Sequence, residues 1–232
     1  MHRDWIRDLL GVIDDRYAAL CPVEPRVAAF SLPDPSPELH VDEAEAFVRG
    51  LEEDLFSVRD TGHFSSPMLP RPEKPQDQRT LNLFDTRGRA SGERLLSREK
   101  LCQMAAAADL VLRYGWPISQ IFVEPSNAVI PGLAWSVDIV VLDPDERPII
   151  YGEVKRSSRL VEELVRGVRD CGRRGPHETD ECGSDQHRKF EALWKSRPQY
   201  FWAVGPGARR AFRLQYAPSF VLDERDHIPR GP

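Results

Sequence analysis

Two segments near the start of the chain, residues 3–20 and 41–58, carry apolar side chains at helical spacing. A period near 3.6 residues gathers such side chains on one face of a helix. Residues 1–60 hold 6 Arg and no Lys against 14 Asp and Glu, a net charge of −8. We therefore expect residues 1–58 to form an acidic helical extension. The apolar positions of its first helix are Trp5, Leu9, Ile13, Tyr17 and Leu20.

Residues 59–92 have a different composition, rich in Pro, Gly and polar side chains. Such a stretch sustains neither a helix nor a central strand. We expect a linker or a long ordered loop here.

The rest of the chain alternates between helix-like and strand-like segments. Residues 92–115 have an alanine-rich centre, with Ser97 placed to cap a helix and Gly115 where that helix would stop. The strand-like segments are apolar at nearly every position, as in strands buried on both faces. The pattern predicts an α/β fold in which helices flank both faces of a mixed sheet, with residues 93–220 as the main domain and 221–232 as a C-terminal tail. The expected strands are residues 119–129, 135–143, 148–155, 199–205 and 211–216, and the other expected helices are residues 159–172 and 185–196.

Composition places this 232-residue chain among globular proteins, with 41% hydrophobic and 30% charged residues. No apolar run approaches the roughly 18 residues of a membrane span, and charges interrupt the apolar residues at the start. We expect a cytoplasmic protein that does not enter a membrane. Four widely spaced cysteines fit reduced thiols better than a disulfide framework. These are Cys21, Cys102, Cys171 and Cys182.

Positive charge is concentrated later in the chain. Residues 155–213 hold 14 Arg and Lys against 8 Asp and Glu, a net charge of +6. Such a region suits a polyanion partner such as nucleic acid, although a solvated charged face has the same composition.

An aspartate stands inside an otherwise apolar strand, and two charged residues follow in the next one. If residues 144–147 form the turn of a hairpin, Asp138 lies directly opposite Glu153, and Lys155 points to the same face. A slip of one residue would separate the two acids. Carboxylates about 5 Å apart repel each other unless a cation lies between them. Mg²⁺, or Mn²⁺ in its place, meets this need, and Lys155 could then orient a water molecule or offset charge in a transition state.

These residues resemble the signature of the PD-(D/E)XK nuclease superfamily, in which an acid on one strand precedes Glu-x-Lys on the next. Here the motif stands as "VD" at 137–138 and "EVK" at 153–155. More narrowly, residues 97–216 resemble the N-terminal nuclease domain of type I restriction enzyme R subunits, which implies a restriction-endonuclease-like fold. The matching segments are "REKLCQMAAAADLVLRYGWP", "VDIVVLD", "GEVKRSS", "DQHRKF" and "YFWAVGPGARRAFRLQY".

The resemblance also implies roles for individual residues. It assigns Gln186 to placing DNA or the catalytic residues, beside the catalytic Asp138, Glu153, Lys155 and Glu99. Its implied metal ligands are Asp138, Glu153, Val154 and Glu99.

The match departs from the family in several places. Phe190 stands where the family has a tyrosine, and Val137 replaces the signature proline. Residues 159–185 are longer than the usual connection in the family, and the match of Gln186 to the family glutamine depends on this connection. Glu93 could take the place of Glu99 if the first helix began earlier.

The sequence thus predicts a metal-dependent endonuclease that hydrolyses phosphodiester bonds in DNA, in defence or repair. Arg156 and Arg159 are expected to reach phosphates. A catalytically inactive nuclease-like subunit that binds nucleic acid or a partner, and an RNA-cleaving nuclease, are the alternatives. The acidic helices are a candidate surface for a protein partner or a second copy of the chain.

Two other interpretations of the charged residues compete with a nuclease site. A structural ion-pair network on a sheet edge could contain the same hairpin residues, but their neighbours are too apolar for an exposed face. Zinc-type ligands also fall close together, although without a Cys-x-x-Cys pair. They are Cys171, His177, Cys182 and His187.

Overall fold

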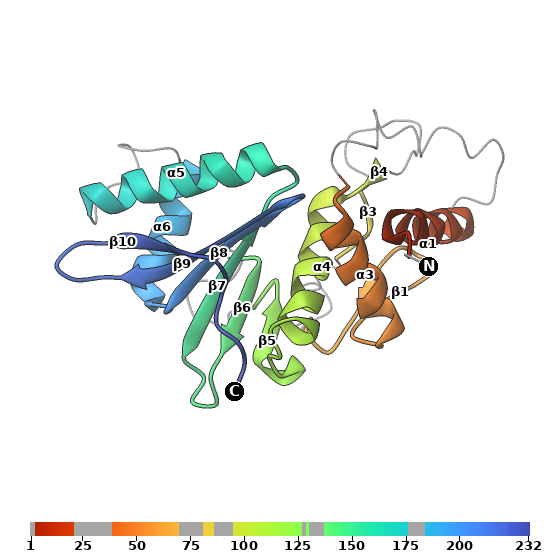
Figure 1. Cartoon of the computed structure of the whole chain (residues 1–232), viewed down its shortest axis with the longest axis horizontal. Coiled ribbons are helices and arrows are strands. Elements are labelled where there is room, and N and C mark those ends of the chain that lie inside the picture. Colours follow the sequence, from red (N-terminus) through yellow and green to blue (C-terminus); the bar gives the residue numbers. More distant parts are fainter. Residues whose placement is uncertain are drawn as a thin grey trace.

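The computed structural model describes residues 3–20, 39–69, 81–85, 95–126, 129, 137–175 and 184–232. Its centre is a six-stranded mixed sheet with the order β10-β9-β8-β7-β6-β5 (Figure 1). Strands β7 and β8 are parallel, and the other neighbouring pairs are antiparallel. The α/β class and the mixed sheet predicted from the sequence are confirmed. The strands are β5 (Ile121–Val123), β6 (Ile139–Leu142), β7 (Pro148–Val154), β8 (Tyr200–Gly205), β9 (Ala208–Gln215) and β10 (Val221–Arg225).

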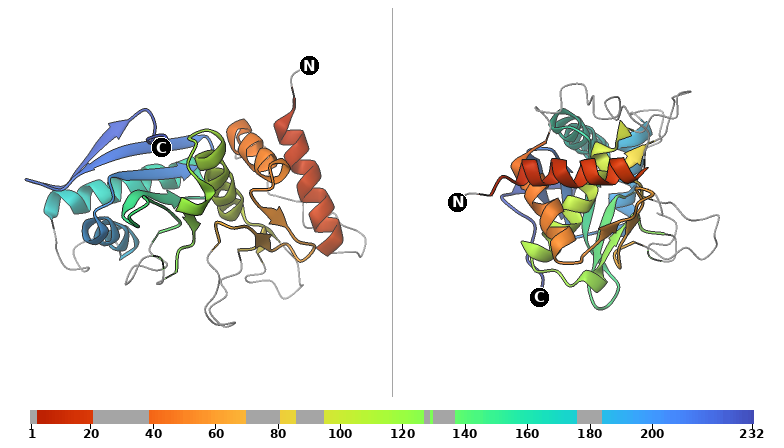
Figure 2. Two further views of the ribbon diagram at one scale, coloured as in Figure 1. Left: turned by 90° about the horizontal axis from the view of Figure 1, so that it is seen from below. Right: turned by 90° about the vertical axis from the view of Figure 1, so that its right-hand side faces the viewer.

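Helices pack on both faces of this sheet. Helix α4 (Arg98–Leu112) covers one face, and α5 (Ser158–Arg174) and α6 (Ser184–Ser196) cover the other. Helix α3 (Val41–Glu52) packs on α4, and α1 (Trp5–Leu20) packs on α3, so these three helices lie in succession outward from the sheet (Figure 2).

The alanine run of α4 explains its close contact with two layers. Ala105, Ala106, Ala107 and Ala108 are all fully buried. Small side chains allow one helix to lie close to both the sheet and α3. The predicted helix is confirmed, with Ser97 at its N-cap position, although the Ser97 side chain makes no capping hydrogen bond.

Side chains of the central strands alternate between two cores. Ile139, Val141 and Ile150 pack on the α4 side, whereas Val140 and Tyr151 pack against α5 and α6. Because helices cover both faces, both sets of positions must be apolar. A polar residue within β6 or β7 therefore requires partners of its own.

The hairpin between β6 and β7 differs from the prediction at its turn but not along its length. Leu142, rather than Asp143, pairs with Pro148, and an irregularity between Val141 and Leu142 absorbs the difference. Beyond it Ile139 pairs with Gly152, as predicted, so the register carries Asp138 to the position opposite Glu153.

Two segments that were expected outside the main domain pack as part of the structure. The predicted C-terminal tail is wrong for residues 221–225, which form the edge strand β10 on β9. Within residues 59–92, Met68, Leu83 and Phe84 are buried in the core on the α4 side. Residues 70–80 and 86–94 lie outside the described part of the chain. The short strand pairs are β1 (Ser57–Val58) with β2 (Phe64–Ser65), and β3 (Phe84–Asp85) with β4 (Leu95–Leu96).

The N-terminal helices share this core instead of forming a second one. Leu9 of α1 and Phe47 of α3 belong to the same cluster of buried side chains as Ile139 in the sheet. Arg209 of β9 also forms ion pairs with both Glu43 of α3 and Asp109 of α4. In the described part of the chain, no helix has the length and apolar character needed to cross a membrane.

The contact between α3 and α4 provides a test of this packing. A Cβ atom at Gly50 would lie 2.5 Å from a ring carbon of Phe56 and 2.9 Å from the Cβ of Ala108. Gly50→Ala should therefore lower the free energy of unfolding by about 1–3 kcal/mol, measured by urea denaturation. Gly11→Ala in α1 is the matched control, because nothing lies within 4 Å of its added carbon. The control should be neutral or stabilising by up to about 1 kcal/mol, since alanine favours helix. Equal effects at both positions would contradict the close packing of α3 on α4.

Candidate functional site

The candidate site begins with a buried carboxylate near the end of β7. Glu153 follows the buried residues Tyr151 and Gly152, and only 3% of its surface is exposed. Strand alternation places its side chain on the same face as Tyr151, towards α5 and α6. A charge at this depth requires compensating partners, because an unpaired buried carboxylate costs several kcal/mol.

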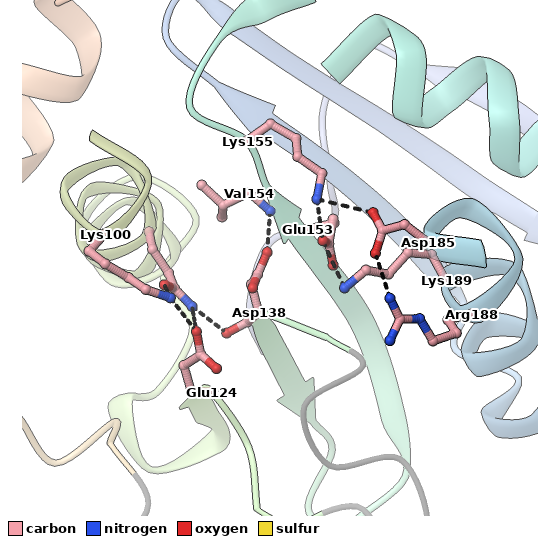
Figure 3. A network of polar contacts seen from close by, with 10 residues as sticks. Lys100, Glu124, Asp138, Glu153, Val154, Lys155, Asp185, Arg188 and Lys189 are labelled. Carbon is pink, nitrogen blue, oxygen red and sulfur yellow. Dashed lines mark hydrogen bonds and ion pairs between the residues drawn. The ribbon is translucent and has the colours of Figure 1, made fainter. Parts of the chain in front are cut away.

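Two ammonium groups supply that compensation. The Nζ atoms of Lys155 and Lys189 lie 2.7 Å and 2.9 Å from the same oxygen, Oε1 of Glu153 (Figure 3). Burial lowers the pKa of Lys155, but its contact with Glu153 outweighs this and raises the pKa above its ordinary value. Lys155 therefore holds its proton more tightly than an exposed lysine does.

Asp138 lies beside this cluster, one residue before β6. Its Oδ2 accepts a hydrogen bond from the backbone N–H of Val154 at 2.7 Å. Burial and the negative charge of Glu153 raise the pKa of Asp138 to about 7, against the opposing effects of Lys189 and the Val154 N–H. Asp138 thus changes its protonation state near neutral pH, unlike an exposed aspartate.

The backbone of Asp138 is held from the α4 side. Its carbonyl oxygen accepts hydrogen bonds from the backbone N–H of Glu124 at 2.8 Å and from Nε2 of Gln103 at 3.0 Å. Gln103 also donates to Oε1 of Glu124 at 3.3 Å, and Lys100 pairs with that oxygen at 2.5 Å. Glu124 has a φ of +50°, a value that is uncommon outside glycine.

Sequence reasoning missed these supporting residues. The available signals were the three-residue spacing of Lys100 and Gln103 on one helix and the irregular end of the strand at Glu124. Neither indicates a partner 35 positions away, which is the separation between Gln103 and Asp138.

Glu99, the predicted acid on the first helix, lies within the electrostatic influence of this centre. Burial raises the pKa of Glu99, and the negative charge of Asp138 raises it further. Lys100 and Lys155 act in the opposite direction. Glu99 is therefore close enough to Asp138 and Lys155 for their charges to act on its carboxyl group.

Helix α6 contributes residues other than the one predicted. Lys189 reaches Glu153, and Asp185 lies 4.0 Å from Lys155. The side chain of Gln186 instead lies against Gly167 of α5. Phe190, at the position of the family tyrosine, is buried in the core on the α5 and α6 side.

The two arginines predicted to bind nucleic acid are exposed. Arg156 lies between β7 and α5, and Arg159 pairs with Glu163 at 2.9 Å within the first turns of α5. Neither contributes to the buried cluster. Of the zinc-type residues, His177 and Cys182 lie outside the described residues, whereas Cys171 is buried in the core on the α5 and α6 side.

The arrangement of these side chains bears directly on the metal ion predicted from the sequence. Among the described residues, no three His, Cys, Asp or Glu side chains are arranged to hold an ion. The oxygen of Glu153 that faces the cluster already carries two ammonium contacts. A cation at this carboxylate would have to share or replace those contacts. Burial and neighbouring carboxylates raise the pKa values of Asp138 and Glu99, and a bound cation would oppose both effects.

Comparisons with protein-family models, curated proteins and solved structures found no match to this chain.

The raised pKa of Asp138 gives a stability prediction with a definite sign. The folded state holds this proton more tightly than the unfolded chain, so the wild type loses stability as pH rises from about 4 to about 7. Asp138→Asn keeps an oxygen for the Val154 N–H but carries no charge. In EDTA above pH 7, its free energy of unfolding should exceed that of the wild type by on the order of 1–3 kcal/mol. The difference should vanish near pH 4.

The control for this experiment is Asp145→Asn, in the exposed turn of the hairpin. Urea denaturation at a series of pH values should give this variant the wild-type pH dependence. A destabilised Asp138→Asn protein at pH 8 would show that the ionised carboxylate is well solvated or well paired, contrary to the structure.

Proposed function

We propose that this chain is a metal-dependent phosphodiesterase that cleaves nucleic acid, with DNA as the substrate and Mg²⁺ or Mn²⁺ as the cofactor. One observation carries the proposal. The β6–β7 register puts Asp138 beside Glu153, and Lys155 contacts Glu153 at 2.7 Å. Two acids that could hold a cation and an ammonium group that could act on a phosphate thus lie together, which supports the proposed hydrolysis of a phosphodiester.

Each residue of the site would have its own role in this reaction. Asp138 and Glu153, with Glu99 and the backbone of Val154, would hold the ion. Lys155 would orient the attacking water or offset negative charge on the phosphate. The bound ion would supply a water of lowered pKa and neutralise charge on the phosphodiester.

The surroundings of the site support a polyanion substrate. Arg156 follows Lys155 directly and is exposed, and Arg159, also exposed, lies in the first turn of α5. Side chains of this kind contact phosphate oxygens without regard to sequence. The restriction-endonuclease-like fold and a role in defence or repair are the finer parts of the proposal, and they rest on the resemblance of residues 97–216.

A second candidate, a nuclease-like subunit without activity, has its own support. Lys155 and Lys189 together already neutralise Glu153, as they would in a purely structural ion-pair network. Such a subunit would bind nucleic acid, or dock a partner or a second copy through its acidic N-terminal helices. Cleavage assays distinguish the two candidates.

The deciding experiment incubates the purified protein with linear, circular and single-stranded DNA and with RNA, in Mg²⁺, Mn²⁺ or EDTA. Cleavage of DNA should require the metal ion. Glu153→Gln and Lys155→Ala should each reduce the rate at least about 100-fold, since Glu153 would hold the ion and Lys155 would act on the attacking water or the phosphate. Cleavage of RNA alone would reassign the substrate.

Matched controls come from helix α6. Glu191 and Lys195 form an exposed pair at 2.5 Å, so Glu191→Gln and Lys195→Ala make the same chemical changes away from the site. Both controls should retain cleavage within about twofold of wild type. Full cleavage by Glu153→Gln, or no cleavage by a folded wild-type protein in any condition, would end the proposal of an active nuclease.

A further inference from the structure

We infer that Lys189 of α6 is a second phosphate-contacting residue of this site, in addition to Lys155. The inference rests on the proposed function. It assigns the substrate contact from α6 to Lys189 rather than to Gln186, which packs on α5.

Lys155 and Lys189 reach the same carboxylate from two different elements. Their Nζ atoms approach Oε1 of Glu153 from β7 and from α6, on different sides of the carboxylate (Figure 3). The side chain of Lys189 is 12% exposed and that of Lys155 is 19% exposed. Both ammonium groups are therefore largely withdrawn from water. In such surroundings each interacts more strongly with an anion than it would in water.

The two ammonium groups meet at one carboxylate oxygen, although Asp185 near Lys155 and Asp138 under the influence of Lys189 offset part of their charge. The second positive charge at the same oxygen repels the first, and desolvation makes that repulsion stronger. An anion that binds beside Glu153 would relieve it. A phosphodiester supplies such an anion, and its charge increases as a hydroxide attacks.

Lysine also has the right donor chemistry. An ammonium group carries three N–H donors, so it can contact a carboxylate and a phosphate oxygen at the same time. Lysine binds phosphate as a point charge on a flexible stem and imposes little geometric demand. Lys189 could thus follow the phosphate as it changes shape during reaction.

The orientation of α6 makes this contact specific to one of its lysines. Asp185 and Lys189, four residues apart, face the site, whereas Glu191 and Lys195 pair on an exposed part of the same helix. Lys195, whose side chain is 60% exposed, therefore provides the control for Lys189.

The test measures binding separately from cleavage. Fluorescence anisotropy in EDTA gives the affinity of the full chain for a labelled DNA duplex at several salt concentrations. Lys189→Gln should weaken binding about tenfold and reduce the slope of log affinity against log salt by about one, as expected for the loss of one phosphate contact. Lys195→Gln should change neither quantity, and Lys189→Arg should restore most of the affinity.

Each outcome bears on one proposal or the other. If the wild type cleaves DNA while Lys189→Gln binds with unchanged affinity and salt slope, Lys189 is structural and this inference is wrong, although the nuclease stands. If the wild type neither binds nor cleaves nucleic acid, the proposed function is wrong, and the inference about Lys189 is wrong with it. Thermal unfolding of each variant sets a common temperature at which all are folded. A lower midpoint with unchanged affinity would also identify Lys189 as structural.

Discussion

The buried negative charge of Glu153 is the constraint on which the polar centre depends. Its carboxylate is buried on the α5 and α6 side of the sheet, where an unpaired charge would destabilise the fold by several kcal/mol. Lys155 compensates from the same strand, and Lys189 compensates from α6. The contact therefore fixes the rotation of α6 about its axis, because only one face of the helix can present Lys189 while Phe190 stays in the core. Stability and candidate chemistry share the same atoms here.

The hairpin register could be predicted because both faces of its strands are buried. Shifting the register by one residue would exchange the α4 side and the α6 side for every side chain, which the packing does not allow. The turn could not be predicted in the same way. The Asp143 side chain accepts hydrogen bonds from the backbone N–H groups of Asp145 and Arg147, and the Asp143 N–H donates to the Arg147 carbonyl, so the turn closes on residues 144–146. The irregularity at Val141 and Leu142 then restores the register that the core requires.

Other features depend on contacts that no local pattern records. The edge strand β10 has only one well-buried apolar residue, Leu222, while Val221 is 41% exposed, so it lacks the continuous apolar run of the central strands. Gln103 and Glu124 support Asp138 only because α4 lies across the ends of β5 and β6. In α6, the family resemblance indicated Gln186, but helix packing turned that residue towards Gly167. Residue identity indicated the charged residues at the ends of β6 and β7 that lie together, whereas tertiary packing determined which residue of α6 joins them.

The distribution of charge over the fold favours one approach for a polyanion. Residues 1–60 carry a net charge of −8, and the helices α1 and α3 that they form lie on the α4 side of the sheet. Residues 155–213 carry +6 and include α5 and α6 on the other side. The pairing of Arg209 with Glu43 and Asp109 holds the acidic helices on their side, because buried charges separate only at high cost. A nucleic acid would therefore be repelled by the N-terminal helices and attracted towards α5 and α6, the direction from which Lys155 and Lys189 meet Glu153.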